Sequence, residues 1–389
     1  MTSCRVACRP VTTILLYGDS LRYPSLRHEV PLEVIDPFLF VERDGETFVL
    51  TSSLEAERIQ AVLEHATIVN MGEVGYYDLV DGGMARDEAE IEVVVRALRR
   101  WDVQQAVVAP DLPVAVADAI RATGVAVTVD SAVVEGRRRV KSAAELEGIR
   151  RAQRAAEAGM AAGEELIRNA ERREGILRGR DGEPLTSERV RAAIRAACAE
   201  HEAPAPPGIM VVSALSGGGH DPGSGPLPAD LPITIDLWPR DEASGCWADM
   251  TRTFVNGEVT DEVETLRAVV LDALAQVRAA ARPGVGGREL YDIAAGVIEA
   301  AGHPTQRTRA PGETLAHGFY FGLGHGVGLE VHEAPGMGLA AGDQLVAGDV
   351  IAIEPGIEGL ERVGGVRYED LVLITDDGSE TLTNYHYDL

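Results

Sequence analysis

The feature of this 389-residue chain that most constrains its fold is a pattern that occurs twice in its C-terminal part. In residues 143–255, two helical segments precede an apolar strand that carries a carboxylate, and a turn then leads to a returning strand that carries a second one. The same order of segments recurs in residues 260–374, where residues 365–374 are expected to form the returning strand. The four carboxylates belong to Asp236, Asp249, Glu354 and Glu369. The pattern predicts two related halves, built of helices and strands, that face each other.

The position of these carboxylates predicts a metal site. A carboxylate on an apolar strand is costly to bury unless it is paired or binds a metal ion. Solvent exposure at a strand end would explain one such carboxylate. It is a poor explanation for four carboxylates in two matched hairpins. Two facing halves would bring the carboxylates together, and like charges at that density require a cation. Four carboxylates and one imidazole suit two divalent ions such as manganese, with cobalt or zinc as alternatives.

The imidazole comes from a glycine-rich stretch, Gly322–Glu333, that contains His325 and His332. Glycine at every second position from 322 to 328 permits backbone angles that other residues avoid. Residues 327–332 read as an extended segment, on which positions an odd number apart face opposite sides, but a bend in the glycines would let both rings converge. Alone, the stretch is equally compatible with a turn whose histidines are incidental. The carboxylates on either side of it favour a site.

Other catalytic signatures do not match the chain. The segment His332-Glu333-Ala334-Pro335 lacks the second histidine of the zinc-protease helix and contains a proline. Gly322-Leu323-Gly324 lacks the third glycine of a dinucleotide-binding loop, because Val327 occupies that position. The sequence contains neither a Gly-x-Ser-x-Gly elbow nor a phosphate-loop lysine.

Residues 1–139 alternate strand and helix signals and predict a small α/β domain without a chemistry-bearing cluster. Within it, Asp44-Gly45 lies between two apolar runs, which is typical of a β-hairpin. A short basic run before residue 140 reads as a solvated domain junction, so we expect residues 140–389 to form the second domain. Two Ser-x-x-Glu patterns, which predict helix N-termini, begin at Ser52 and Ser142.

Composition excludes several classes of protein. With 45% hydrophobic and 25% charged residues the chain is an ordinary globular protein, and its length favours two domains. A formal charge of −26 argues against nucleic acid or an anionic membrane as a partner. The four cysteines form no ligand-spaced set, which predicts a reducing, cytoplasmic location. The apolar run Val11–Tyr17 is too short to span a membrane, and we expect it to be the first strand.

Four separated segments of the C-terminal part resemble, in the right order, motifs of one family. They are Asp249–Phe254, Gly324–Glu333, Ile353–Gly356 and Gly365–Val372. The family is that of the creatinase, methionine aminopeptidase, aminopeptidase P and prolidase metallopeptidases. The resemblance covers the chain from about residue 140 and implies a C-terminal domain of the pita-bread fold with a pseudo-twofold repeat. The two-domain layout is similar to the aminopeptidase P, prolidase and creatinase branch, so residues 1–139 are expected to form a creatinase-like α/β domain.

The resemblance also implies the metal ligands, which are Asp236, Asp249, His325, Glu354 and Glu369. Asp236 would bind one ion, and His325 with Glu354 would bind the other. Asp249 and Glu369 would bridge both ions. The turn between Asp236 and Asp249 is longer than is usual in the family, and Leu237-Trp238-Pro239 replaces the common small residues after the first aspartate. These departures affect the neighbouring pocket and leave the ligands intact.

Four residues are implied in catalysis: His220, His332, Glu354 and Arg367. The two histidines look like the pair of non-ligand histidines that contact substrate and stabilise the tetrahedral intermediate, while Glu354 would also relay a proton. Arg367 stands where the prolidase and aminopeptidase P branch often has an arginine next to the ligands. A solvated loop histidine is the alternative interpretation of His220.

The resemblance implies a dinuclear-metal Xaa-Pro peptidase of the aminopeptidase P or prolidase type. It would hydrolyse the bond between an N-terminal residue and proline through a metal-bridging hydroxide. The expected substrate is a peptide with proline at its second position, and the expected assembly is a homodimer. One alternative is a creatinase-like hydrolase of non-peptide amides, and another is a non-catalytic interaction protein of the same fold. Retention of all five ligands argues against both.

Overall fold

The structure is a computed structural model that describes residues 13–213 and 220–389. The chain divides into two compact units, Met1–Arg138 and Arg139–Leu389, which are described separately below. Among the described residues, none of the helices combines the length and the apolar character needed to cross a bilayer.

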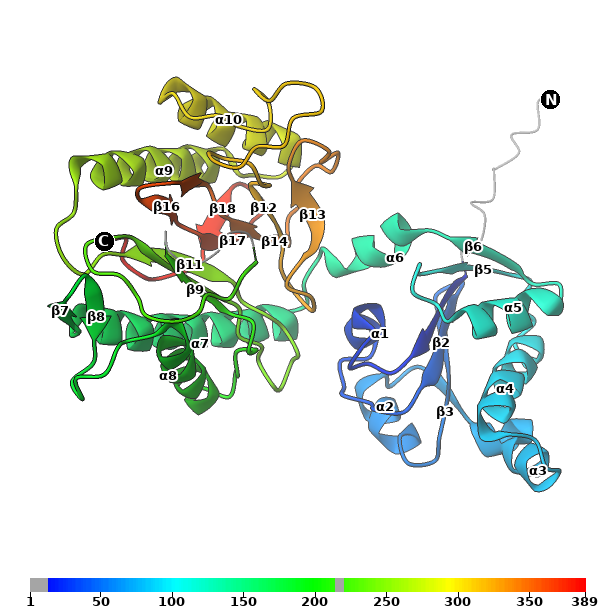
Figure 1. Ribbon diagram of the computed structural model, residues 1–389. Helices are drawn as coiled ribbons and strands as arrows, with labels where there is room; N and C mark the ends of the chain where they lie inside the picture. The colour runs from blue at the N-terminus through cyan, green and yellow to red at the C-terminus, as the bar shows by residue number, and fades with distance from the viewer. Residues whose placement is uncertain (1–12, 214–219) are drawn as a thin grey trace, which may run out of the picture. The chain divides into compact units, whose positions relative to one another are not determined.

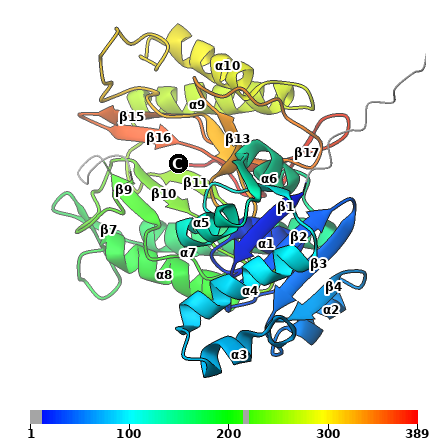
Figure 2. The same ribbon diagram turned by 90° about the vertical axis from the view of Figure 1, so that its right-hand side faces the viewer.

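The described part of the first unit is built on a six-stranded mixed sheet with strand order β4-β3-β2-β1-β5-β6, of which Figure 2 shows β1 to β4 side by side. The strands are β1 (Ile14–Gly18), β2 (Phe38–Arg43), β3 (Glu46–Thr51), β4 (Thr67–Asn70), β5 (Gln105–Val108) and β6 (Ala126–Val129). The helices are α1 (Pro24–Glu29), α2 (Ala56–Val62), the 3₁₀ helix η1 (Met71–Val74), α3 (Tyr76–Asp81), α4 (Arg86–Arg100), α5 (Val114–Ala122) and α6 (Ser131–Arg138).

The central strand β1 is buried on both faces of the sheet. Leu15 and Tyr17 of β1 pack with residues of α4 and α5, while Ile14 and Leu16 pack with residues of α1 and α2. A strand buried on both faces reads as a continuous apolar run, as β1 does. The predicted hairpin at Asp44 is confirmed: β2 pairs antiparallel with β3, and both turn residues have positive φ, as a type I′ turn requires.

In the described part of the second unit, two sheets carry the strands that position the site. One has the order β11-β10-β9, and the other has the order β13-β12-β14-β17-β18. The first half consists of α7 (Ala143–Arg168), β7 (Glu171–Arg173), β8 (Ile176–Arg178), α8 (Ser187–Glu200), β9 (Met210–Ser213), β10 (Ile233–Leu237) and β11 (Met250–Phe254). The second consists of α9 (Asp261–Ala280), α10 (Gly287–Ala300), β12 (Gly324–Gly326), β13 (Glu333–Met337), β14 (Val350–Ile353), β15 (Gly356–Leu360), β16 (Gly364–Arg367), β17 (Asp370–Ile374) and β18 (Ser379–Thr381).

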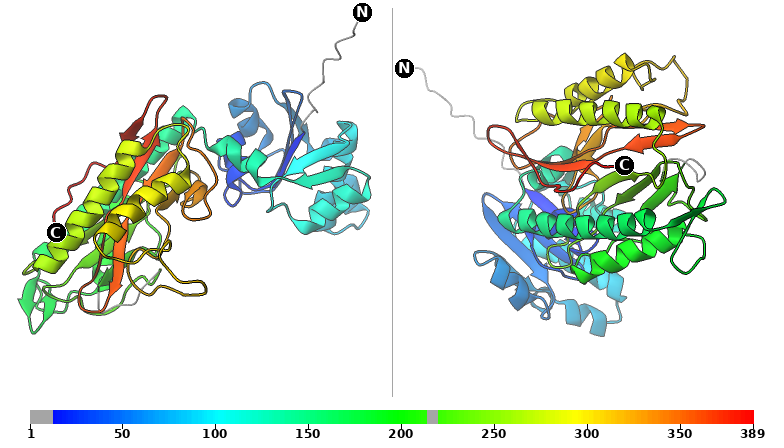
Figure 3. Two further views of the ribbon diagram at one scale, coloured as in Figure 1. Left: turned by 90° about the horizontal axis from the view of Figure 1, so that it is seen from above. Right: turned by 90° about the vertical axis from the view of Figure 1, so that its left-hand side faces the viewer.

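The two halves repeat one arrangement. Strands β9, β10 and β11 pair in the same antiparallel order as β12, β14 and β17. Helices α7 and α8 pack on the first half and α9 and α10 on the second, with the strands between the two helix pairs (Figures 1 and 3). The halves join where β11 meets the start of β17, because the Glu369 amide donates to the Thr251 carbonyl at 3.1 Å. The duplicated pattern in the sequence therefore corresponds to two packed halves.

Three local expectations need correction. Residues 365–374 form two strands, β16 and β17, that pair with β15 and β14 respectively, and the break falls at Tyr368-Glu369. Residues 327–332 are a series of bends between β12 and β13, and they lie outside both strands. The pattern at Ser52 does not cap a helix: α2 begins after Glu55, which instead forms an ion pair with Arg58. The capping box at Ser142 is confirmed, since Ser142 and Glu145 bond reciprocally.

Candidate metal centre

The five predicted ligands lie at or beside strand ends of the two sheets. Asp236 lies on β10, and Asp249 comes directly before β11. His325 is the central residue of β12. Glu354 directly follows β14, and Glu369 directly precedes β17. Two of these strands belong to the first half and three to the second, so the group assembles only when the halves pack against each other.

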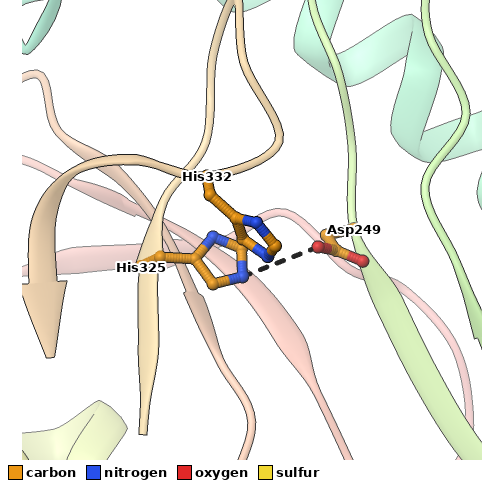
Figure 4. A group of neighbouring side chains, drawn as sticks. All are labelled: Asp249, His325 and His332. Carbon is orange, nitrogen blue, oxygen red and sulfur yellow. Dashed lines mark ion pairs between the residues drawn. The ribbon is translucent and has the colours of Figure 1, made fainter. Parts of the chain in front are cut away.

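Within the described part of the chain, side-chain ligand atoms converge in three overlapping sets. Within each set they lie within 4.8 Å of one another. The sets are Asp236, Asp249 and Glu369; His325, Glu354 and Glu369; and Asp249, His325 and His332. The first two sets contain all five predicted ligands and share Glu369. The third set, drawn in Figure 4, adds a histidine that the sequence assigned to substrate contact.

His325 presents one ring nitrogen to the carboxylates. Its Nδ1 lies 3.1 Å from the Gly326 carbonyl oxygen, while its Nε2 lies 3.7 Å from Asp249 Oδ2 and 3.6 Å from Glu354 Oε1. A proton on Nδ1 would be donated to that carbonyl and leave the Nε2 lone pair facing the site. Burial and, to a smaller extent, the charge of His332 lower the pKa of His325 to about 4. The neutral imidazole that a metal ion requires is therefore the stable form.

Three of the carboxylates, those of Asp249, Glu354 and Glu369, are destabilised as anions in the absence of a cation. Asp249 is 4% exposed and Glu369 is 1% exposed. Burial, followed by the charges of neighbouring carboxylates, raises the pKa of both residues well above the usual range. Burial also raises the pKa of Glu354 to about 8, with Arg367 opposing the shift and Asp236 adding to it. Positive ions bound between these carboxyl groups would favour their ionised form.

The residues present fit divalent metal ions. Oδ1 of Asp236 is buried and accepts no hydrogen bond from the described residues, which leaves a lone pair available. The donor set is made of carboxylate oxygens and one neutral imidazole nitrogen, the ligands that hard and borderline divalent cations prefer.

Arg367 supplies positive charge next to this group. Its Nη2 donates to Asp236 Oδ2 at 2.7 Å, and its Nη1 lies 3.9 Å from Glu354 Oε2. Nη1 also lies 3.6 Å from Glu358 Oε1. Neighbouring carboxylates raise the pKa of Arg367 against the effect of burial, so the guanidinium stays charged. These contacts place Arg367 beside Asp236 and Glu354.

The two remaining histidines differ in placement. The His332 ring lies 4.2 Å from the His325 ring, centroid to centroid, and is nearly perpendicular to it (Figure 4). Burial lowers the pKa of His332, and the charge of His220 lowers it further. His220 is exposed and follows directly after the residues outside the described part of the chain. Its electrostatic effect on His332 is the feature that associates it with the site.

Two residues that contact members of this group were not predicted from the sequence. Thr251 Oγ1 donates to Glu369 Oε2 at 2.7 Å, and Glu358 contacts Arg367. The sequence contains a signal for Thr251, because residues two positions apart on a strand share a face and Thr251 lies two positions after Asp249. Glu358 depends on the pairing of β15 with β16, in which Gly356 opposes Arg367. No local signal predicts that register.

A cavity of about 260 Å³ is lined by residues that neighbour Asp236 and Arg367. Strands β9 and β10 and the β15–β16 hairpin line it, together with Ala316 and Tyr320. Thr234 and Glu358 are part of the lining. Thr234 lies two positions before Asp236 on β10 and so shares its face, and Glu358 contacts Arg367. The cavity therefore lies on the side of the group that Asp236 and Arg367 occupy.

Sequence comparison identifies a family and several relatives of this chain. Residues 147–376 match the metallopeptidase family M24. The Xaa-Pro dipeptidase of Pyrococcus horikoshii is 39% identical over 142 residues, which cover 36% of this chain and 37% of that protein. The Xaa-Pro dipeptidase of Pyrococcus furiosus has the same identity over the same length and the same coverage of each chain. These alignments span little more than a third of the length of the curated relatives.

Structural comparison extends over nearly the whole chain. The prolidase from Pyrococcus horikoshii has a TM-score of 0.72 at 23% identity, covering 97% of this chain and 95% of that one. The Xaa-Pro dipeptidase from Bacillus anthracis has a TM-score of 0.76 at 22% identity, covering 97% and 94%. The X-Pro aminopeptidase from Thermotoga maritima has a TM-score of 0.75 at 20% identity, covering 97% and 98%.

At these identities the structural likeness establishes the fold. The expected two-domain architecture, with a small α/β domain and a pita-bread domain, is confirmed. The sequence match covers more than half of the chain and includes all five predicted ligands. The chain therefore belongs to metallopeptidase family M24, in the group that comprises creatinase, prolidase and aminopeptidase P.

Proposed function

We propose that this protein is a dinuclear-metal Xaa-Pro peptidase that hydrolyses the bond between an N-terminal residue and proline. The observation that carries the proposal is the convergence of two ligand sets that share Glu369. Membership of family M24 and similarity to two Xaa-Pro dipeptidases support the same activity.

The assignment of ligands follows from the two sets. Asp236 would hold one ion, while His325 and Glu354 would hold the other. Asp249 and Glu369 would contact both. The oxygen-rich donor set favours manganese, with cobalt or zinc as alternatives. When bound, the two ions activate a water molecule and polarise the scissile carbonyl group.

The chain's own residues then perform the remaining tasks. His332, next to His325 at the edge of the group, would donate a hydrogen bond to the oxygen on which negative charge develops. His220 would assist the departure of the prolyl nitrogen. Glu354 would relay the proton between the attacking water and that nitrogen. Arg367 would hold Asp236 in position through its 2.7 Å hydrogen bond.

Proline at the second position suits this kind of site. The prolyl nitrogen carries no hydrogen, so a peptidase that must bind a backbone N–H at that position cannot use the bond. A metal centre acts on the carbonyl group and therefore has no need of that contact. The surrounding carboxylates would attract the free N-terminal ammonium, which favours removal of the first residue over internal cleavage. The cavity beside Asp236 offers space for part of the substrate.

We also propose that the protein works as a cytoplasmic homodimer on small peptides, without nucleic acid or membrane as a partner. The net charge of −26 supports the exclusion of polyanions. Cys198 and Cys246 are buried free thiols, which supports a reducing compartment. The dimer rests on the family resemblance, and a monomeric mass by light scattering at micromolar protein would contradict it.

The decisive experiment combines elemental analysis with peptide products. The purified protein, loaded with Mn²⁺, is assayed against Ala-Pro, Ala-Pro-Ala and Ala-Ala-Ala, with Asp236→Asn as the control. We expect two ions per chain and release of alanine from the proline peptides. Cleavage of Ala-Pro alone identifies a dipeptide-specific enzyme, and cleavage of both identifies an aminopeptidase. Cleavage of neither proline peptide by protein that carries both ions refutes the peptidase assignment.

A further inference from the structure

The residues on both sides of Glu369 are tied to one aromatic residue near the C-terminus, Tyr387. The Tyr368 hydroxyl donates to the Tyr387 carbonyl oxygen at 3.2 Å. The Tyr387 hydroxyl in turn donates to Asp370 Oδ2 at 2.6 Å. Tyr368 and Asp370 are the immediate neighbours of Glu369. The backbone that carries this carboxylate is therefore held at both ends by the same residue.

A buried arginine adds a third connection. Arg252 is fully buried, and its Nη1 donates to the carbonyl oxygens of Glu369 at 2.7 Å and of Thr251 at 2.8 Å. Its Nη2 donates to Asp370 Oδ1 at 3.0 Å. The guanidinium carbon lies 4.6 Å from the centroid of the Tyr387 ring, which is cation–π distance. The Tyr387 ring thus covers the cation that holds the Glu369 backbone.

The C-terminal segment keeps Tyr387 in this position. The Tyr387 carbonyl oxygen also accepts from Arg267 Nε at 3.0 Å, and its hydroxyl oxygen accepts from Arg278 Nη1 at 2.9 Å. Arg252 Nε donates to the His386 carbonyl oxygen at 2.8 Å. Asp370 is itself fully buried and accepts from Arg278 as well. The ring, the hydroxyl and the carbonyl oxygen of Tyr387 are each engaged.

We propose that Tyr387 is a positioning residue for Glu369 and that the C-terminal segment is thereby part of the support of the metal centre. This inference rests on the proposed role of Glu369 as the carboxylate common to both ions. Thr251 fixes one oxygen of that carboxylate, and Tyr387 together with Arg252 fixes its backbone. Because Glu369 belongs to both of the ligand sets that hold the predicted ligands, a shift of its backbone alters the geometry for both ions.

The chain offers a matched control two residues earlier. Tyr385 lies in the same segment, and its hydroxyl donates to Glu164 on α7. Both tyrosines therefore pair a hydroxyl with a carboxylate, but only that of Tyr387 leads to a neighbour of Glu369. Substitution of either tyrosine by phenylalanine removes one such bond and keeps the ring. A purely structural role of the segment predicts similar consequences for the two variants.

The test is a calorimetric titration of the metal-stripped full chain with Mn²⁺ alone. The proteins compared are wild type, Tyr387→Phe, Tyr387→Leu and Tyr385→Phe. We expect Tyr387→Phe to weaken Mn²⁺ binding about 10-fold, and Tyr387→Leu, which also removes the ring beside Arg252, to weaken it towards 100-fold. Tyr385→Phe should stay within about twofold of wild type. Thermal unfolding in EDTA measures stability separately from metal binding.

Each outcome has a definite meaning. Weakened binding confined to the Tyr387 variants, with similar unfolding temperatures in EDTA for the two phenylalanine variants, supports the inference. Wild-type Mn²⁺ affinity in Tyr387→Phe, or an equal loss in Tyr385→Phe, overturns it and leaves the proposed metal centre intact. If the wild type itself binds no Mn²⁺, the proposed function and this inference fail together. Should Tyr387→Leu not fold, Tyr387→Phe still decides.

Discussion

Replacement of Asp249 by asparagine should affect the stability of the metal-free and the metal-loaded protein in opposite directions. Asparagine has nearly the shape of aspartate but carries no charge and is a much poorer ligand for a hard cation. Asp249 is 4% exposed and faces the carboxylates of Glu369, Asp236 and Glu354. Without metal, its negative charge is opposed by burial and by those neighbours. The metal-free variant should therefore be as stable as the metal-free wild type or more stable.

With metal, the expected order is reversed. A ligand present at 100 times its Kd stabilises the native state by about 2.7 kcal/mol, so two ions contribute about 5 kcal/mol. In a domain of 150–250 residues, 1 kcal/mol corresponds to roughly 2–4 °C, which gives an increase of about 10–20 °C in the unfolding temperature of the wild type. If Asp249 contacts both ions, the asparagine variant should lose most of this increase.

The measurement is differential scanning calorimetry of both proteins, in EDTA and in Mn²⁺, following the transition of the unit Arg139–Leu389. Two results would refute the reasoning. A metal-free variant that melts well below the metal-free wild type would show that the Asp249 carboxylate stabilises the fold without metal. A variant that keeps the full Mn²⁺-dependent increase would show that Asp249 is not a ligand of either ion.

Three further predictions concern the site. Chelation should abolish peptidase activity and Mn²⁺ or Co²⁺ should restore it, whereas full activity in a preparation shown metal-free by elemental analysis would contradict the metal mechanism. His332→Ala should lower kcat by roughly 10²–10³ with both ions retained, because the variant loses one hydrogen-bond donor to the developing charge. Loss of an ion from the variant would instead show that His332 is a ligand, which its position in the set with Asp249 and His325 permits. Thr251→Val removes the 2.7 Å hydrogen bond to Glu369 Oε2 and should weaken Mn²⁺ binding about 10-fold, and an unchanged affinity would show that this bond does not orient the carboxylate.

Local chemistry in the sequence was sufficient to predict several elements. The Asp44-Gly45 hairpin follows from two residues that tolerate positive φ between two apolar runs. The helix that starts after Ser142 follows from a reciprocal pair of hydrogen bonds within four residues. The same pattern at Ser52 is followed by a helix but produced no cap at Ser52: α2 begins after Glu55, whose side chain pairs with Arg58.

The break between β16 and β17 at Tyr368-Glu369 could not be predicted from any local pattern. Residues 365–374 have the composition of one continuous strand, and that is what the sequence predicted. The chain changes partners there, from β15 to β14, because Glu369 is bound to β11 of the other half through the Thr251 carbonyl oxygen. Contacts with residues more than 100 positions away decide where the strand ends, and no short window of sequence contains them.

By itself, the sequence determined the kinds of groups available and the duplicated order in which they occur. Carboxylates on apolar strands and a glycine-framed histidine imply a buried cation, because the energetic cost of burying a charge is a property of the group and needs no coordinates. Only the tertiary structure decided which atoms meet. Packing of the two halves brings His325 Nε2 within 4 Å of Asp249 and Arg367 within hydrogen-bond distance of Asp236. Pairing of β12 with β14 brings the same nitrogen within 4 Å of Glu354, and the C-terminal segment brings Tyr387 into contact with the residues on both sides of Glu369. Those contacts depend on strand register and on the join between β11 and β17, which are set by the collective packing of residues far apart in the chain.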